Sequence, residues 1–173
     1  MNLLQRFQQI KVFIFDVDGV LTNGDLLILE SGEWARVMHV KDGYALQLAI
    51  KQGYRILIVS GSGPSAVQGR LNKLGIREIY FGIKDKQAFI RQWMQEQQAA
   101  PETVLFMGDD IPDLPVFDIV GLSACPADAV SEILQKAIFV SGHTGGKGCV
   151  REVIEKVLRS NGHWGMDAQV AST

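Results

Sequence analysis

Cysteine is scarce in this chain, which limits how its fold can be stabilised. There are two cysteines among 173 residues, Cys125 and Cys149. Two cysteines cannot form a disulfide framework, and neither has a cysteine or histidine at zinc-finger spacing. A single bridge between the two is the alternative, but buried, reduced thiols are the simpler expectation. The sequence therefore excludes the disulfide-rich and zinc-finger classes.

An excess of basic charge and a long hydrophobic run are also missing from the sequence. The 17 lysines and arginines nearly balance 19 aspartates and glutamates, for a net charge of −2, so we expect no nucleic-acid partner. No apolar run approaches the roughly 20 residues that span a bilayer. The first ten residues are too polar for the core of a signal peptide. We therefore expect a cytoplasmic protein with no membrane partner.

The composition that remains is typical of a folded globular protein. Hydrophobic residues make up 47% of the chain and charged residues 21%. A chain of this size buries roughly 70% of its unfolded surface, which is enough to fold without a metal or a disulfide. We expect residues 1–173 to form one domain.

Four short apolar runs, rich in β-branched and aromatic residues, predict the strands of a parallel sheet. They are residues 12–15, 55–59, 78–81 and 104–107. Their apolarity is continuous rather than alternating, which is typical of strands that are buried on both faces. Helical patterns lie between the strands, so we expect right-handed βαβ units and a doubly wound α/β fold.

Helix signals fill the segments between the strands. Asp42 and Asp85 are expected to cap two helices, and Pro64 is expected in the first turn of a third. An amphipathic helix is predicted over residues 149–159, followed by a tail that is loose or ordered only by docking. Residues 25–40 depart from the alternation of strands and helices. Two short apolar runs around a glycine-containing turn predict an inserted β-hairpin there.

Polar side chains follow each predicted strand, at the place where open α/β sheets bind their ligands. They come from four separate segments and are Asp16, Asp18, Ser60, Lys84, Lys86, Asp109, Asp110 and Asp113. Parallel strands end at the same edge of a sheet. We therefore expect these carboxylate, hydroxyl and ammonium groups to lie close together.

These chemical groups suit the binding and transfer of a phosphoryl group. Carboxylate oxygens favour Mg²⁺ over softer metals, and a lysine and a magnesium ion together offset the repulsion between carboxylates. A serine hydroxyl and glycine-flanked amides at a helix N-terminus can bind phosphate oxygens. One carboxylate can attack phosphorus and form an aspartyl-phosphate. A second carboxylate, two residues on, can protonate the leaving oxygen and then activate water.

The motifs, in this order, resemble those of the haloacid dehalogenase phosphatases. The matching residues are Asp16-x-Asp18-Gly19-Val20, Ser60, Lys86 and Gly108-Asp109-Asp110-x-x-Asp113. Further segments extend the resemblance over nearly the whole chain to the 3-deoxy-D-manno-octulosonate 8-phosphate phosphatases, which lack a large cap domain. These segments are residues 16–22, the hairpin, residues 39–43, and Gly145-Gly146-Lys147-Gly148 before the last helix.

The resemblance implies which residues carry the reaction and hold the metal. Asp16 would be the nucleophile and a Mg²⁺ ligand. Asp18 would be the general acid/base, and a second ligand through its backbone carbonyl. Asp109 would be the third protein ligand of the metal ion.

The resemblance also assigns the residues around this centre. Ser60 would bind the phosphoryl group, and Lys86 would neutralise the charge of the nucleophile and the phosphate. Lys84 is the alternative lysine, but Lys86 fits the Gly-x-x-Asp/Glu-Lys pattern of the family. Asp110 and Asp113 would orient the lysine or metal-bound water, although both are also ordinary capping residues for a short turn.

The residues that would contact the rest of the substrate are less clearly marked. They are Gly61, Lys41, Asp42, Arg70 and Lys147, and helix capping and solvated surface charge are the competing interpretations. The chain also departs from the pattern of the octulosonate enzymes. Ser62 replaces their arginine, where nine-carbon relatives have a glutamate, and Lys41 replaces a second arginine. Lysine is not a neutral substitute for an arginine that binds through two nitrogens.

The expected function is therefore Mg²⁺-dependent hydrolysis of 3-deoxy-D-manno-octulosonate 8-phosphate through an aspartyl-phosphate. A nine-carbon ulosonate 9-phosphate is the alternative substrate. The resemblance implies a homotetramer whose hairpins pack together, and the apolar character of residues 26–38 indicates a buried interface. A non-catalytic tetramerisation module is the second alternative, but it predicts loss of motif carboxylates that this sequence retains.

Overall fold

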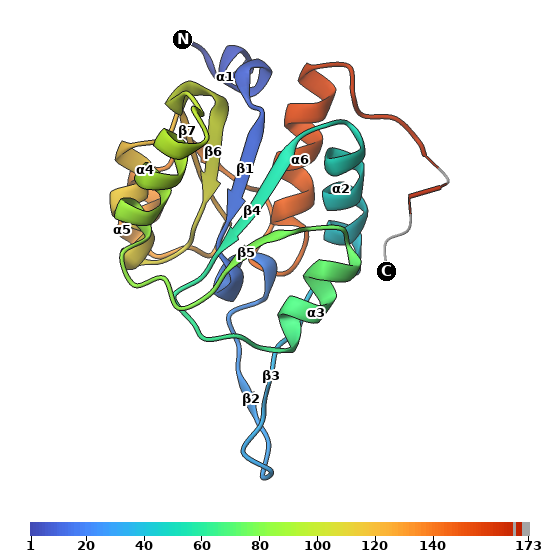
Figure 1. Ribbon diagram of the computed structural model, residues 1–173, viewed down its shortest axis with the longest axis vertical. Helices are drawn as coiled ribbons and strands as arrows, with labels where there is room; N and C mark the ends of the chain where they lie inside the picture. Colours follow the sequence, from blue (N-terminus) through green and yellow to red (C-terminus); the bar gives the residue numbers. More distant parts are fainter. Residues whose placement is uncertain (168, 171–173) are drawn as a thin grey trace.

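A six-stranded parallel sheet forms the centre of the computed structural model (Figure 1). The structure describes residues 1–167, 169 and 170. In their order across the sheet, the strands are β5 (Glu78–Tyr80), β4 (Arg55–Val59), β1 (Val12–Phe15), β6 (Val104–Met107), β7 (Leu122–Cys125) and β8 (Phe139–Val140). The first strand lies inside the sheet and later strands are added on both of its sides. This order confirms the predicted doubly wound α/β fold.

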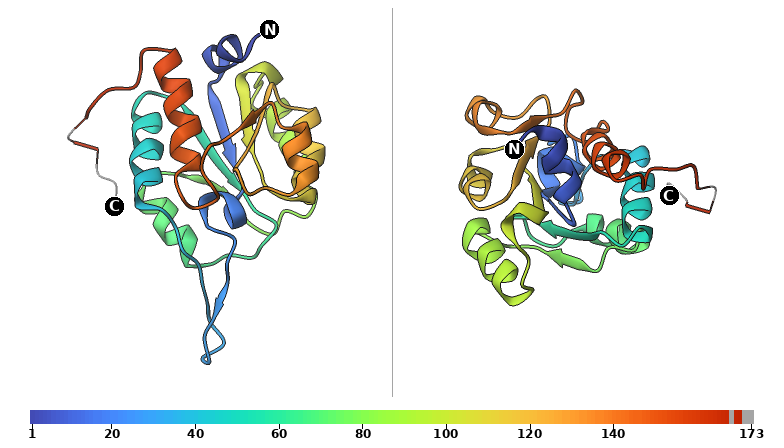
Figure 2. Two further views of the ribbon diagram at one scale, coloured as in Figure 1. Left: turned by 180° about the vertical axis from the view of Figure 1, so that it is seen from behind. Right: turned by 90° about the horizontal axis from the view of Figure 1, so that it is seen from above.

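Helices cover both faces of the sheet (Figure 2). One face packs against α1 (Leu3–Gln9), α2 (Val40–Lys51), α3 (Ala66–Lys73) and α6 (Cys149–Ser160). The other face packs against α4 (Lys86–Glu96), the 3₁₀ helix η3 (Ile111–Asp118) and α5 (Ser131–Lys136). Two short turns, η1 (Val17–Leu21) and η2 (Pro101–Thr103), complete the described helical elements.

Successive side chains of β1 enter two different cores. Phe13 and Phe15 share one core with residues of α2 and α6. Val12 and Ile14 share the other with residues of α4 and η3. Because side chains alternate between the faces of a strand, a strand covered on both faces must be apolar throughout. Burial of each large side chain contributes roughly 1.5–3 kcal/mol.

Most of the predicted elements are confirmed, and the elements that were not predicted are short or polar. The runs at 12–15, 55–59 and 104–107 are strands with those bounds, and β5 ends one residue before the predicted end. Asp85 caps α4 by accepting a hydrogen bond from the Ala88 N–H at 2.9 Å. The sequence analysis did not identify α1, β7, β8 or α5. These elements have at most seven residues, and β7 carries a serine in its middle.

Two predicted helix starts are wrong. Helix α2 begins at Val40, so Asp42 lies in its first turn, where it caps a different helix. The Asp42 carboxylate accepts a hydrogen bond from the Arg151 N–H of α6 at 2.8 Å. Helix α3 begins at Ala66, so Pro64 lies in the preceding loop. Side chains that cap a helix distant in sequence cannot be told from local caps by spacing alone.

The predicted hairpin is present and projects from the sheet edge at which β1 ends (Figure 1). Its strands, β2 (Leu27–Ile28) and β3 (Trp34–Ala35), pair antiparallel. A bridge between Thr22 and Met38 closes its base. Ile28 is 68% exposed and Trp34 is 58% exposed. The hairpin therefore presents large apolar side chains to solvent.

The segment after α6 docks on α2 and on Tyr54, the residue before β4, as the sequence allowed. The Tyr44 hydroxyl donates to the Gly165 carbonyl at 3.1 Å, and the Tyr54 hydroxyl lies 2.9 Å from His163 Nδ1. Both cysteines are buried and free, as expected. Within the described ranges, no helix combines the length and the apolarity needed to cross a bilayer. A cytoplasmic location stays a prediction.

The loop before α6 packs against the loop that follows β1. The Gly146 N–H donates to the Val20 carbonyl at 2.9 Å. A Cβ atom at Gly145 would lie 2.0 Å from the Gly19 carbonyl oxygen and 3.0 Å from that of Thr22. Both of these neighbours are backbone atoms, which cannot rotate away as a side chain can. Glycine at position 145 is therefore required for this close approach.

We predict that Gly145→Ala lowers the free energy of unfolding by about 1–3 kcal/mol, the usual cost of overpacking a dense interior. Urea denaturation followed by circular dichroism measures the change. Gly69→Ala is the matched control, because a Cβ at this exposed position of α3 meets open space. Its stability is expected to stay equal or to rise by about 0.5–1 kcal/mol. Equal unfolding midpoints for the two variants would contradict the prediction.

Candidate active site

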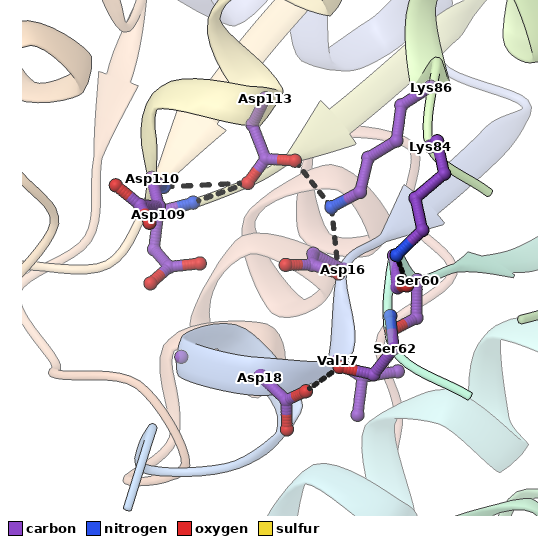
Figure 3. Close-up of polar contacts among 12 residues, drawn as sticks. Asp16, Val17, Asp18, Ser60, Ser62, Lys84, Lys86, Asp109, Asp110 and Asp113 are labelled. Carbon is purple, nitrogen blue, oxygen red and sulfur yellow. Dashed lines mark hydrogen bonds and ion pairs between the residues drawn. The ribbon is translucent and has the colours of Figure 1, made fainter. Parts of the chain in front are cut away.

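The strand ends identified in the sequence meet at one edge of the sheet (Figure 3). Asp16 follows β1, Ser60 follows β4, Asp109 follows β6, and Lys86 begins α4 beyond β5. These residues line a cavity of about 450 Å³. The other lining residues are Asp18, Gly19, Gly24, Gly61, Ser62, Ile83, Lys84, Asp110, Pro112 and Asp113. The structure thus brings the four motifs together.

Lys86 connects two carboxylates inside this cavity. Its Nζ atom lies 2.9 Å from Asp16 Oδ1 and 2.6 Å from Asp113 Oδ1. Only 5% of Lys86 is exposed. Burial by itself would lower the pKa of this lysine, but the two carboxylates outweigh burial and raise it. Lys84 is instead exposed and donates to the Gly61 carbonyl at 3.2 Å, so Lys86 is the lysine at the centre of the site.

Asp16 and Asp109 are carboxyl groups with raised pKa values. Burial, with the charge of Asp113, raises the pKa of Asp16 to about 6, although Lys86 opposes the shift. Burial and the charges of Asp16, Asp113 and Asp110 raise the pKa of Asp109 to about 8. Asp109 Oδ1 is buried and accepts no hydrogen bond from any described residue. The site therefore concentrates more negative charge than its lysine compensates.

This arrangement fits a divalent cation. Carboxylate oxygens of Asp16, Asp109 and Asp113 lie within 4.8 Å of one another. Asp113 already accepts hydrogen bonds from Lys86 and from the Asp109 N–H, which leaves the other two carboxylates freer to bind a metal. Hard oxygen ligands of this kind suit Mg²⁺. A Cβ at Gly19 would lie 2.0 Å from Asp109 Oδ2, so glycine is needed for the carboxylate to approach this loop.

Ser60 is buried with its hydroxyl facing the cavity. Its Oγ atom accepts a hydrogen bond from the Ser62 N–H at 3.1 Å, and only 1% of the residue is exposed. A serine hydroxyl accepts and donates at the same time. The hydroxyl proton of Ser60 can therefore be donated to an anion in the cavity.

Asp18 lines the same cavity but binds residues of the hairpin and of the loop after β4. Arg36 Nε lies 2.6 Å from Asp18 Oδ1, and the Ser62 hydroxyl donates to Asp18 Oδ2 at 2.7 Å. Burial would raise the pKa of Asp18, but these hydrogen bonds and the arginine charge outweigh burial and lower it. Sequence analysis did not identify Arg36, because it lies 18 residues from Asp18 in a hairpin with no chemical motif.

The residues predicted to contact the rest of the substrate are dispersed. Gly61 lines the catalytic cavity, whereas Lys41 and Lys147 line a separate cavity of about 670 Å³ near the starts of α2 and α6. Arg70 lines a third cavity, of about 280 Å³, beside β3. Asp42 is buried and holds the N-terminus of α6. Of the five residues predicted to contact the rest of the substrate, only Gly61 lines the cavity that contains Asp16.

Known proteins resemble this chain in both sequence and structure. A family model described as haloacid dehalogenase-like hydrolase matches residues 77–154. The 3-deoxy-D-manno-octulosonate 8-phosphate phosphatase of Yersinia pestis is 36% identical over 157 residues, which cover 91% of this chain and 84% of that protein.

Solved structures agree with the sequence comparison. A crystal structure of the Yersinia pestis phosphatase matches with a TM-score of 0.90 and 35% identity, over 93% of this chain and 87% of that one. The Moraxella catarrhalis phosphatase, in complex with a magnesium ion, a phosphate ion and a KDO molecule, matches with a TM-score of 0.89 and 28% identity, over 92% and 91%. The chain belongs to the haloacid dehalogenase-like hydrolases, in the family of the 3-deoxy-D-manno-octulosonate 8-phosphate phosphatases.

Proposed function

We propose that this protein is a Mg²⁺-dependent phosphatase that hydrolyses 3-deoxy-D-manno-octulosonate 8-phosphate. The observation that carries the proposal is the presence of Asp16, Ser60, Lys86 and Asp109 in a single cavity. The names of the relatives and the ligands of the Moraxella catarrhalis enzyme support the substrate and the metal. A non-catalytic role is not favoured, because every motif residue needed for chemistry is in place.

The metal ion would be held by the carboxylates of Asp16 and Asp109 and by the backbone carbonyl of Asp18. When bound, Mg²⁺ supplies positive charge that offsets the carboxylates and polarises a phosphate oxygen. Oδ1 of Asp109 has no hydrogen-bond partner in the described part of the chain, and the pKa of this carboxyl group is raised. A bound cation would relieve both features. Asp113 would serve the site indirectly, by holding Lys86.

The first half of the reaction would transfer the phosphoryl group to the protein. Asp16 attacks phosphorus and forms an aspartyl-phosphate. Lys86, 2.9 Å from Asp16, would stabilise the negative charge on the phosphoryl oxygens as the bond to the sugar breaks. The Ser60 hydroxyl would donate a hydrogen bond to one of these oxygens. These groups mainly position the phosphate and neutralise its charge.

Asp18 would move the protons in both halves of the reaction. It would protonate the sugar oxygen as the sugar leaves, and then take a proton from the water molecule that hydrolyses the aspartyl-phosphate. Its place at the cavity edge, two residues after Asp16, suits this role. Asp110 caps η3 and would orient the loop that carries Asp109.

A nine-carbon ulosonate 9-phosphate is the second candidate substrate. Ser62 lines the cavity at the position where the sequence pattern of the octulosonate enzymes has an arginine. A short hydroxyl leaves more room and less positive charge than an arginine does. Only the sugar part of the substrate is affected, because the phosphoryl-binding residues are unchanged.

We also propose that the protein forms a homotetramer through its hairpins. Exposed Leu27, Ile28 and Trp34 support this assembly, since monomeric proteins rarely expose contiguous apolar patches of this kind. A neighbouring copy would then supply substrate contacts that the cavity of a single chain lacks. Arg70, which lies beside β3, is a candidate for such a contact.

Phosphate release from a panel of sugar phosphates tests the proposed activity. We expect the highest kcat/KM for the octulosonate 8-phosphate, and only with Mg²⁺. Asp16→Asn removes the nucleophile and should lower kcat by at least about 10³-fold. Asp118→Asn is the matched control, because Asp118 is exposed and pairs with Lys136 outside the cavity. Its activity should stay within about twofold of the wild type.

Two outcomes would change this interpretation in different ways. A folded protein that releases phosphate from no phosphomonoester would overturn the proposed activity. Preference for the nine-carbon substrate would leave the chemistry intact and change the sugar.

Thermal unfolding should show that magnesium stabilises the protein more at high pH. The carboxyl groups of Asp16 and Asp109 have pKa values of about 6 and about 8 in the metal-free fold, above those of the unfolded chain. The folded state therefore binds more protons than the unfolded state, and metal-free stability falls as the pH rises from about 4 to about 8. Mg²⁺ binds only the ionised carboxylates, so its effect grows over the same range.

Differential scanning fluorimetry with Mg²⁺ or EDTA at pH 5.5 and pH 8.5, both within the usual stability range, measures this dependence. We expect a larger rise in Tm with Mg²⁺ at the higher pH. Asp109→Asn should remove most of that rise. An equal rise at both pH values, or its persistence in Asp109→Asn, would be evidence against the metal site.

Light scattering of the protein at micromolar concentration tests the assembly. We expect the mass of four chains of 19.1 kDa. Ile28→Glu combined with Trp34→Glu should produce monomers, because buried carboxylates at an apolar interface are strongly unfavourable. Ile138→Glu replaces an exposed apolar residue away from the hairpin and should leave the mass unchanged. A wild-type monomer would refute the tetramer.

A further inference from the structure

The hairpin turns one side chain inward, and that side chain binds Asp18. Arg36 Nε lies 2.6 Å from Asp18 Oδ1, and a second guanidinium nitrogen lies 3.3 Å from Oδ2. Only 8% of the Arg36 side chain is exposed, although Ala35 and Val37 on either side are exposed. Arg36 thus belongs to the edge of the site, while its neighbours in the chain face solvent.

Ser62 approaches the same carboxylate from the loop after β4. Its hydroxyl donates to Asp18 Oδ2 at 2.7 Å, the contact drawn in Figure 3. Its backbone N–H donates to Ser60 Oγ at 3.1 Å. Ser62 therefore connects the serine that faces the cavity with the carboxylate at the cavity edge.

Three hydrogen bonds on two oxygens restrict both side-chain torsions of Asp18. An arginine that binds through two nitrogens fixes the plane of a carboxylate as well as its position. A group that transfers a proton in a transition state must lie within hydrogen-bond reach of its target. Misplacement by about 1 Å can cost roughly 10²-fold in rate. The contacts of Asp18 therefore bear directly on proton transfer.

We propose that Arg36, assisted by Ser62, is a positioning residue that holds the Asp18 carboxyl group for proton transfer to the leaving oxygen. This inference rests on the proposed phosphatase activity. In the step concerned, an oxygen of Asp16 forms a bond to phosphorus while the bond from phosphorus to the sugar oxygen breaks. The bonding electron pair stays on the sugar oxygen, which takes the proton of Asp18 and leaves as an alcohol. Because Arg36 and Ser62 lower the pKa of Asp18, the protonated carboxyl group is the minor form, and it is a stronger acid towards the developing alkoxide. Arg36 acts through Asp18.

Aryl phosphates that differ in the basicity of their leaving oxygen separate this role from substrate binding. They carry no sugar carboxylate that Arg36 could bind, and kcat/KM includes the step in which the leaving group departs. For Arg36→Ala we expect kcat/KM to fall by roughly 10²-fold on phenyl phosphate, whose leaving oxygen needs a proton. On p-nitrophenyl phosphate, whose leaving oxygen needs none, the loss should be under about 5-fold.

Further variants test the geometry of the contact. Arg36→Lys keeps the charge but not the two-nitrogen contact, so its losses should lie between those of Arg36→Ala and the wild type. Ser62→Ala should give a smaller loss with the same dependence on the leaving group. Arg77→Ala is the matched control, because Arg77 is exposed and donates to the Asn72 carbonyl. Thermal unfolding of each variant shows that the fold is intact.

A double variant shows whether Arg36 acts through Asp18. Adding Arg36→Ala to Asp18→Asn should cause no further loss of kcat/KM if the two residues act as a unit. The inference would be overturned if Arg36→Ala lowered kcat/KM as much in the Asp18→Asn background as in the wild type. It would also be overturned if Arg36→Ala lowered kcat/KM equally on all the aryl phosphates. The proposed phosphatase activity would stand in both cases. A wild-type protein inactive on every phosphomonoester would overturn the proposed activity and this inference with it.

Discussion

A buried lysine among buried aspartates is the interaction on which the rest of the site depends. Lys86 lies within 3 Å of carboxylate oxygens of both Asp16 and Asp113, and removal of one partner from such a buried pair typically costs about 3–5 kcal/mol. Lys86 also stands in the first turn of α4, where the helix dipole disfavours a cation. Its position is therefore explained by the carboxylates it serves and not by helix stability.

The parallel sheet explains how so much like charge can be held in one place. Strands β1, β4, β5 and β6 are adjacent and end at the same edge, so each loop needs only a few residues to reach the cavity. Close backbone contacts then fix these loops, and Gly19 allows the Asp109 carboxylate to approach without a clash. The rigidity of the sheet keeps the carboxylates together against their repulsion, and the remaining charge favours a divalent cation and a phosphate.

The elements that sequence analysis identified are those whose signal is local. The strand β1 is apolar on both faces, and Asp85 caps the helix that it precedes, so a short window is enough to recognise either. Asp42 has the same local pattern as Asp85 but caps α6, which lies more than 100 residues further along the chain. A side chain can satisfy any backbone amide that the fold brings near it, so the partner cannot be deduced from spacing.

The sequence by itself determined the doubly wound fold, the order of the four motifs, and the motif residues that share the cavity, among them Asp16, Lys86 and Asp109. These follow from the burial pattern of the strands and from the rule that parallel strands end at one edge. Only the tertiary structure decided that Arg36 and Ser62 bind Asp18, and that Lys41, Arg70 and Lys147 lie apart from the cavity. The direction of the hairpin and the loops sets these contacts, because it depends on packing between distant segments.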